Sequence, residues 1–194
     1  MSKTVLFVAS VTKKHILQFH LPYMKWFKDH GYKVHVCAGD DFEPDEPKNV
    51  PYCDKYYIVP FYRSPFATQT YRSYKELRKL IEENEYELVH CHTPVAAAIA
   101  RYAFRTARKK QGTTVLYTAH GFHFYKGAPK ISRLYYAAEK ALIRYTDGII
   151  TINEEDYLAA KKMCRNKKCD AYKIPGIGID LSRVRNSSRT KESI

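Results

Sequence analysis

Glycine is scarce in this sequence, and the glycine-rich loops that bind phosphate are missing. Eight of the 194 residues are glycine, and the turn after the first strand-like run, ASVTKKHILQ (9–18), contains none. A nicotinamide-binding fold carries G-x-G-x-x-G at that turn, a P-loop carries G-x-x-x-x-G-K-[ST], and an α/β-hydrolase carries G-x-S-x-G at its nucleophile. None of these patterns occurs in the chain. Their absence argues against a nicotinamide enzyme and against a P-loop nucleotidase.

The cysteines form neither a disulfide framework nor a zinc motif. Their number, five, is odd, and they lack a framework spacing, so the sequence predicts a reducing compartment. Cys164 and Cys169 in CRNKKC lack the two-residue spacing and the histidine companions typical of zinc ligands. We therefore predict no metal site.

Long apolar runs are also missing. No stretch approaches the roughly 20 apolar residues that a membrane-spanning helix needs. The first ten residues, MSKTVLFVAS, lead directly into polar sequence and are typical of a first strand, not of a signal peptide. We expect a cytoplasmic protein.

Positive charge is plentiful. The chain has 33 basic and 20 acidic residues, a formal net charge of +13. Such a balance favours anionic partners: nucleic acid, phosphorylated metabolites or an acidic membrane surface. No RNP-type aromatic motif or helix-turn-helix pattern is present, and the charge is spread along the chain. We expect no nucleic-acid partner, although a basic RNA-binding domain stays open as an alternative.

Short β-branched runs alternate with longer segments of helical spacing. The predicted strands are 4–9, 33–38, 55–60, 87–91, 113–118, 148–152 and 171–175, and the predicted helices are 15–30, 71–84, 94–110, 129–146 and 154–164. Several of the strands are continuously apolar, as strands covered on both faces are. This alternation predicts an α/β fold with a doubly wound, mostly parallel, Rossmann-like sheet. An acidic, proline-rich loop is expected over 39–54.

Glycines and prolines mark the ends of these helices. Gly31 and Gly112 fit the C-terminal caps of helices that precede strands. Pro94 and Pro129 fit first helical turns. Pro22 falls inside a helical segment, which must therefore be kinked or begin late.

The apolar residues of two helices share a face at helical spacing. In one helix these are Leu77, Leu80 and Ile81; in the other they are Leu134, Ala138, Ala141 and Leu142.

Five of the eight histidines follow predicted strands, where an open parallel sheet binds its ligands. They are His15, His20, His92, His120 and His123. His120 is the best candidate because Gly121 follows it, which allows a ligand to approach the backbone closely. A neutral imidazole there can bind a sugar hydroxyl, and a protonated one can bind phosphate.

Each of the other histidines also has a structural interpretation. We expect His90 to be a packed strand residue with a hydrogen-bonded ring. We expect His20 and His123 to be surface or helix-face residues. His92 precedes Thr93-Pro94 and can cap the following helix. Lys14, with its neighbour Lys13, either adds positive charge at the same edge or belongs to a solvated loop.

Five stretches, in this order and spacing, resemble the amino-terminal domain of family 4 glycosyltransferases with the GT-B fold. They are KTVLFVAS…HILQFHLPYMKWFKDHGYKVHVCA, ELVHCHTPVAAAIAR, VLYTAHGFHFY, AEKALIRYTDGIITINEED and KIPGIGID, which together span nearly residues 3 to 181. The similarity is greatest to the bacterial capsular and exopolysaccharide branch. It implies a single Rossmann-like half of a GT-B architecture.

The resemblance implies transfer of a sugar from a nucleotide-sugar donor, with retention of configuration and without a required metal. The nucleotide sugar is a co-substrate, and no cofactor is expected. The implied acceptor is a saccharide or a polyprenyl-diphosphate-linked sugar, which places the protein on the inner face of the cytoplasmic membrane. His120 matches the catalytic His-Gly turn. The expected substrate-binding residues are His15, His92, Gly121, His123 and Lys14.

Two departures from the family pattern matter. The turn after the first strand, SVTKKHI, lacks the Gly-Gly pair with which many members approach the donor. The donor-binding second domain, with its E-x7-E motif, is also absent. We therefore expect a fragment that is inactive alone, with a domain over 1–181 and a polar basic tail over 182–194 that is disordered or begins the second domain. The alternative is a non-catalytic sugar- or lipid-diphosphate-binding subunit that needs a partner chain. An exposed apolar face could also drive formation of a homo-oligomer.

Overall fold

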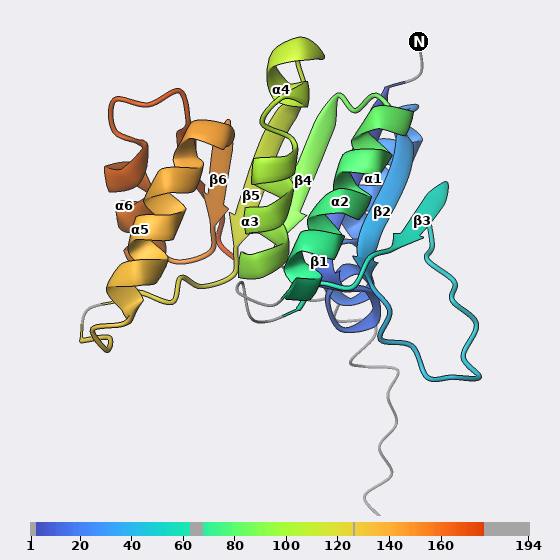
Figure 1. Cartoon of the computed structure of the whole chain (residues 1–194), viewed down its shortest axis with the longest axis horizontal. Helices are drawn as coiled ribbons and strands as arrows, with labels where there is room; N and C mark the ends of the chain where they lie inside the picture. The colour runs from blue at the N-terminus through green and yellow to red at the C-terminus, as the bar shows by residue number, and fades with distance from the viewer. Residues whose placement is uncertain (1–2, 63–67, 126, 177–194) are drawn as a thin grey trace, which may run out of the picture.

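Seven parallel strands form one sheet through the centre of the molecule (Figure 1). The computed structural model describes residues 3–62, 68–125 and 127–176. The strands are β1 (Thr4–Val11), β2 (Lys33–Gly39), β3 (Lys55–Ile58), β4 (Leu88–His92), β5 (Thr114–Ala119), β6 (Gly148–Thr151) and β7 (Asp170–Lys173). Their order in the sheet is β3-β2-β1-β4-β5-β6-β7. All seven predicted strands are confirmed, within a few residues at their ends.

Alternate residues of the central strands enter two separate cores. Along β1, Val5 and Phe7 pack into one core, whereas Leu6 and Val8 pack into the other. All four side chains are fully buried. This burial on both faces explains why the strand is continuously apolar.

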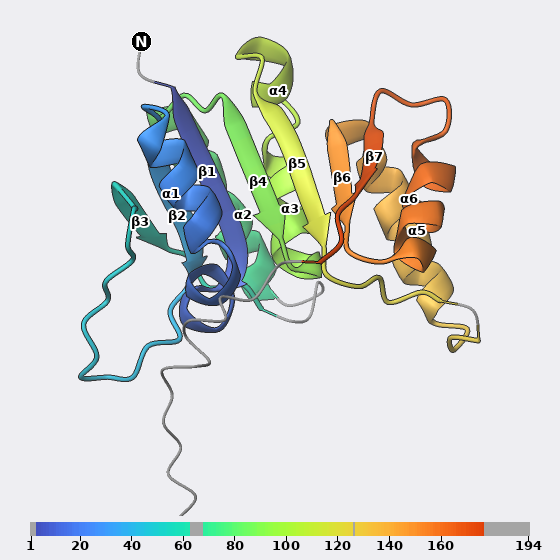
Figure 2. The same cartoon turned by 180° about the vertical axis from the view of Figure 1, so that it is seen from behind.

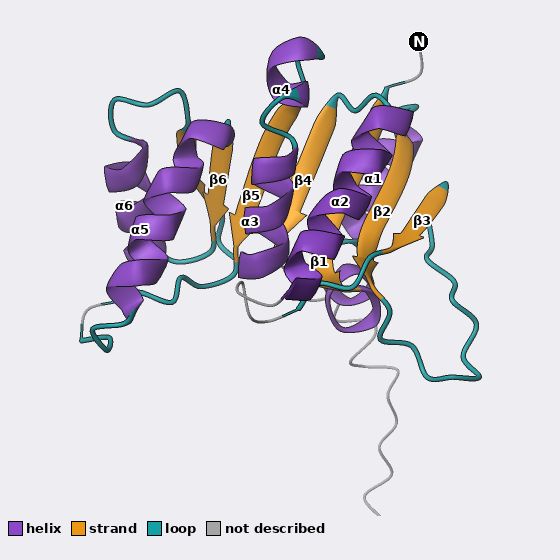
Figure 3. Ribbon diagram, viewed as in Figure 1, coloured by secondary structure: helices purple, strands orange, loops and turns teal. Residues whose placement is uncertain are grey.

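The helices cover the two faces unequally (Figures 2 and 3). They are the π-helical turn η1 (Thr12–Leu17), α1 (Leu21–Asp29), α2 (Thr68–Glu83), α3 (Pro94–Ala103), α4 (Ala107–Lys110), α5 (Ser132–Leu142), the 3₁₀ turn η2 (Ile143–Tyr145) and α6 (Glu154–Cys164). Residues of η1 and α1 pack into one core, and residues of α2, α3 and α6 pack into the other. On the α1 side, no helix within the described residues covers β4 to β7 (Figure 2). The doubly wound α/β prediction is confirmed, with most helices on one face.

Most of the predicted helix boundaries are confirmed. Gly31 and Gly112 have φ of 81° and 72°, and Pro94 begins α3. Pro22 lies in the first turn of α1, which begins late, after η1. The prediction for Pro129 is wrong, because α5 begins three residues later, at Ser132. The predicted helix 94–110 is interrupted between α3 and α4.

The apolar face predicted for the helix over 129–146, which forms α5, does not face the core. Leu134 is 63% exposed, and Ala138 and Ala141 are also exposed. The buried residues of α5 are Ser132 and Glu139. In contrast, the predicted face of α2 is confirmed, since Leu77, Leu80 and Ile81 are all buried.

The expected loop over 39–54 has no helix or strand beyond Gly39. The predicted domain end at residue 181 and the tail 182–194 lie outside the described residues. Within the described part of the chain, no helix has the length and apolarity needed to cross a bilayer.

Candidate functional site

The strand order reverses between β1 and β4, and the candidate site lies beyond the carboxyl ends of these strands. The chain leaves β1 toward β2 on one side and returns through β4 on the other. In Figure 1 these strand ends point to the lower edge of the sheet, where η1 and the turn after β5 lie. Open α/β sheets bind ligands at such a switch point.

Four imidazoles converge at this edge, and we name them the histidine cluster: His15, His20, His92 and His120. One ring nitrogen from each lies within 4.8 Å of those from the other three. The ring centroids of His20 and His92 are 3.7 Å apart, and those of His15 and His120 are 4.7 Å apart. The sequence predicted that His15, His92 and His120 share this edge, and the structure brings their rings together.

His20 was expected on the surface, and that expectation is wrong: its side chain is 2% exposed. In a regular α-helix, residues five apart point about 140° away from each other. The π-helical turn η1 begins the segment instead, and its hydrogen bonds join residues five apart. His20 lies beyond the end of η1, as the N-cap residue of α1, and its ring centroid is 5.1 Å from that of His15. The sequence carries no signal for a π-helical turn.

The pleat of the sheet places the remaining members of the cluster. His92 of β4 pairs in register with Thr118 of β5. Because strand side chains alternate between faces, His90, His92, Thr118 and His120 all point away from the core that α2 and α3 cover. His90 donates to or accepts from the Thr118 hydroxyl at 2.8 Å. The prediction of a packed, hydrogen-bonded His90 is confirmed.

Burial keeps these imidazoles neutral. Desolvation, together with neighbouring imidazoles, lowers the pKa of His15 to about 4, of His20 to about 2 and of His90 to about 3. The pKa of His92 is held well below its usual value by the same causes, and burial lowers that of His120. A neutral imidazole offers one N–H donor and one lone pair. The cluster therefore suits hydroxyl groups or cations better than phosphate.

Several buried nitrogens of the cluster have no hydrogen-bond partner within the described residues. They are Nε2 of His15 and His120 and both ring nitrogens of His20 and of His92. His92 therefore does not cap α3. A cavity of about 90 Å³ adjoins the cluster, lined by His20, Tyr23, His90, His92, Thr118, His120, Ile150 and Ile174.

Gly121 and a buried carboxylate shape the turn after His120. Gly121 has a φ of 137°, and a Cβ added there would have no atom within 4 Å. The next N–H, of Phe122, donates to both carboxylate oxygens of Asp156 at 3.3 Å. Asp156 belongs to α6 and is 5% exposed. On the Phe122 side, hydrogen bonds to Asp156 therefore hold the turn against α6. Next to the Cα of Gly121, no other residue fills the space.

Thr93 connects the ends of β1 and β4 at the switch point. Its hydroxyl accepts from the N–H of Ser10 at 3.0 Å and shares a hydrogen bond of 2.7 Å with the Ser10 hydroxyl. Thr93 has a φ of 60°, which is strained for a β-branched residue. Such strain is typical of functional sites. The sequence did not predict a role for Ser10 or Thr93, and the signal that could have indicated one was the Thr93-Pro94 pair directly after a strand.

Lys14 and His123 do not join the histidine cluster. Both are exposed, and the His123 ring lies against Tyr135, with centroids 5.3 Å apart. The N–H of Lys14 donates to Asp41, which also accepts from the N–H groups of Thr12 and Lys13. These three amides, which could otherwise bind an anion, are occupied by a carboxylate of the chain itself.

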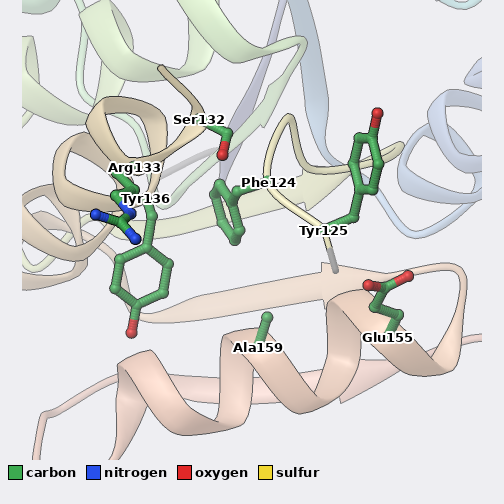
Figure 4. A pocket seen from close by; sticks show the side chains of 7 residues that line it. All are labelled: Phe124, Tyr125, Ser132, Arg133, Tyr136, Glu155 and Ala159. Carbon is green, nitrogen blue, oxygen red and sulfur yellow. The ribbon is translucent and has the colours of Figure 1, made fainter. Parts of the chain in front are cut away.

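A second cavity, of about 340 Å³, lies beyond the His-Gly turn (Figure 4). Its lining comes from the turn, from α5 and from α6: Phe124, Tyr125, Ser132, Arg133, Tyr136, Glu155 and Ala159. Figure 4 shows Phe124 and Tyr136 above Ala159 of α6. The Phe124 ring stacks on Phe122 at 4.6 Å and meets Tyr136 edge-on at 5.2 Å. This cavity has an aromatic wall and one side chain of each charge, Arg133 and Glu155.

The sequence of residues 4–153 matches the family described as glycosyl transferase 4-like. That match covers most of the chain, including η1, β4 and the turn after β5. The chain belongs to this family. The resemblance inferred from the five motifs is therefore confirmed.

A curated relative extends the family assignment. The Bacillus subtilis (strain 168) protein named "Putative glycosyltransferase EpsD" is 50% identical over 186 residues, which are 95% of this chain and 46% of that protein. The chain thus spans about half the length of the curated relative that it matches.

Solved structures support the fold. Anabaena HepE, determined in complex with UDP and glucose, has a TM-score of 0.60 at 14% identity; the match covers 93% of this chain and 46% of that one. Sucrose-phosphate synthase from Thermosynechococcus elongatus has a TM-score of 0.57 at 14% identity, over 94% of this chain and 49% of that one. The fold matches a single Rossmann-like half of the GT-B architecture.

Proposed function

We propose that this chain is the acceptor-side half of a retaining glycosyltransferase. It acts in transfer of a sugar from a nucleotide-sugar donor to a polyprenyl-diphosphate-linked or saccharide acceptor during assembly of a surface polysaccharide. Membership of the glycosyl transferase 4-like family supports glycosyl transfer. The donor is a co-substrate, and the proposal includes no cofactor.

The turn at His120 and Gly121 carries this proposal. During transfer, the bond between the donor sugar's C1 and the diphosphate oxygen breaks. A bond from C1 to the acceptor oxygen forms, and the acceptor hydroxyl loses its proton. The unpartnered Nε2 of His120 can hydrogen-bond a sugar hydroxyl in the reacting complex. Gly121 leaves the space in front of the turn open, and His15 and His92 lie beside it.

An exposed patch beside the second cavity supports a lipid-linked acceptor at the inner face of the cytoplasmic membrane. We name it the α5 patch: Tyr125, Lys130, Ile131, Arg133 and Leu134. The three apolar members are 57–63% exposed, and both basic members are exposed. Apolar side chains among cations suit an anionic bilayer surface.

In the proposed enzyme, donor binding belongs to a second domain of the GT-B architecture. By family resemblance, residues 1–181 correspond to the acceptor-side domain. The chain's share of the EpsD relative, 46%, supports this division.

The test restores a second half to the chain and measures turnover with candidate nucleotide sugars and a polyprenyl-diphosphate-linked sugar. His120→Ala should reduce turnover about 100-fold or more, as loss of one transition-state hydrogen-bonding group does. His30→Ala, an exposed histidine on another edge, is the matched control. Full turnover by His120→Ala would overturn the role of the turn. Turnover only after addition of a separate partner chain would favour the non-catalytic subunit.

A further inference from the structure

The imidazoles of the histidine cluster are buried, lie close together and leave several ring nitrogens without a hydrogen-bond partner among the described residues. Binding of a sugar hydroxyl at His120 alone would not require this arrangement. His20 and His92 are 2% and 0% exposed, and among the described residues neither ring nitrogen of either one has a hydrogen-bond partner. Leaving a buried polar atom unpaired costs about 1–3 kcal/mol. A ligand that binds several of these nitrogens at once would offset that cost.

The chemistry of the nitrogens selects the class of ligand. Each imidazole can offer the lone pair of one ring nitrogen. Lone pairs repel phosphate and attract an electron-pair acceptor. The four converging residues include no carboxylate, and Mg²⁺ and Ca²⁺ prefer oxygen ligands. Imidazole nitrogens suit zinc, copper, nickel and iron.

We propose that His15, His20, His92 and His120 bind one divalent transition-metal ion, with Zn²⁺ as the best fit to four nitrogen ligands. Tetrahedral zinc with Zn–N bonds of about 2.0–2.1 Å needs nitrogens about 3.3–3.4 Å apart. The four nitrogens lie within 4.8 Å of one another. Small ring rotations would close this gap.

The ion would join four segments at the switch point. His15 belongs to η1, His20 precedes α1, His92 ends β4 and His120 follows β5. His90 stays outside the ligand set because Thr118 binds its Nε2. The inference departs from the sequence prediction of no metal. It does not rest on the proposed transfer reaction, and an ion bound to His120 would compete with a sugar hydroxyl for that imidazole.

Two cysteines form the obvious competing site. The Sγ atoms of Cys164 and Cys169 are 3.3 Å apart, but no third ligand joins them within the described residues. Serine substitutions at both positions therefore give a background that removes thiolate binding and leaves the histidine cluster intact.

The experiment titrates Zn²⁺ and Co²⁺ into the chain, expressed without a polyhistidine tag and treated with a chelator. We expect one ion per chain and the visible absorption of tetrahedral Co²⁺, without sulfur charge-transfer bands. His92→Gln and His20→Gln should each weaken binding about tenfold or more, whereas His30→Ala and the double variant Cys164→Ser/Cys169→Ser should stay within about twofold. Circular dichroism checks folding. If the buried variants do not fold, His120→Ala supplies the ligand deletion at a half-buried turn.

Three results would overturn the proposal. The first is no metal binding by the unsubstituted chain, and the second is loss of binding in the variant Cys164→Ser/Cys169→Ser. The third is unchanged binding in a folded variant that lacks one histidine of the cluster. Because no sugar enters the assay, its failure leaves the proposed glycosyl transfer untouched.

Discussion

Arg101 of α3 and Glu139 of α5 form a buried ion pair with two hydrogen bonds, of 2.8 and 3.1 Å. The Arg101 side chain is 0% exposed and that of Glu139 is 10% exposed. The guanidinium also lies 4.2 Å from the centre of the Tyr117 ring. Burial alone would lower the pKa of Arg101, but the charge of Glu139 raises it above its usual value. The pair fixes α5, and with it the α5 patch, against α3.

Removing one partner of this pair should destabilise the fold strongly. Glu139→Gln leaves the Arg101 charge buried without its counterion, which should reduce the free energy of unfolding by about 3–5 kcal/mol. The double variant Arg101→Met/Glu139→Leu removes both charges and should lie closer to the unsubstituted chain. Urea unfolding of the single and double variants measures this. A loss under about 1 kcal/mol in Glu139→Gln would contradict the role of the pair.

The same pair explains what the sequence could and could not predict. The centre of the sheet was predictable because strands such as β1, β2 and β4 are largely apolar and buried on both faces. For α5, apolar spacing pointed to Leu134, Ala138 and Ala141, yet the buried face contains Glu139. A glutamate can face a core only when a cation from another element meets it, and Arg101 lies 38 positions earlier. Local periodicity contains no information about such a partner.

Acid should destabilise the folded chain from about pH 6.5 downward, because the buried histidines resist protonation. Above the unfolded pKa of about 6.5, these imidazoles are neutral in both states and contribute nothing to the pH dependence. Below it, the unfolded chain binds protons that the folded chain does not, since the folded pKa of His15 is about 4, of His90 about 3 and of His20 about 2. Stability then falls by at most about 1.4 kcal/mol per pH unit for each histidine.

Urea unfolding at about pH 7.5 and about pH 5.5 checks this dependence, because the two values lie on either side of the unfolded pKa. His92→Gln should flatten the slope by about one histidine's share, whereas the exposed His30→Ala should not. Equal stability of the unsubstituted chain at both pH values would show that the cluster is accessible to protons in the folded state.

The position of the His-Gly turn should depend on Asp156. Asp156→Ala removes the acceptor of the Phe122 N–H and should reduce the free energy of unfolding by about 1–3 kcal/mol. Hydrogen exchange at the Phe122 amide should accelerate at the same time. Asp156→Asn keeps one acceptor oxygen and should lose less protection. Glu154→Ala, in the same helical turn but exposed, controls for the helix dipole; if it accelerates exchange equally, Asp156 has no specific role.

The candidate site was only partly predictable, for reasons that differ between its members. His15, His92 and His120 follow predicted strands, so parallel topology was enough to place them at one edge. His20 joins them from the junction between η1 and α1, whose geometry no pattern in the sequence predicts. Asp156 reaches the turn from α6, 34 positions after Phe122 in the chain. Such contacts depend on tertiary packing, which no short motif encodes.

The α5 patch should bind anionic membranes. Burying one leucine or isoleucine side chain contributes about 1.5–3 kcal/mol. Ile131→Ser/Leu134→Ser should therefore weaken binding to phosphatidylglycerol vesicles about tenfold or more, given that 1.4 kcal/mol corresponds to a factor of ten. Cosedimentation with vesicles measures this, and added salt should weaken binding because Lys130 and Arg133 contribute electrostatically. Ile58→Ser is the matched control: its side chain is 48% exposed, and β3 lies at the opposite edge of the sheet. Equal loss in both variants would mean that exposed apolar surface in general, and not the α5 patch, drives the binding.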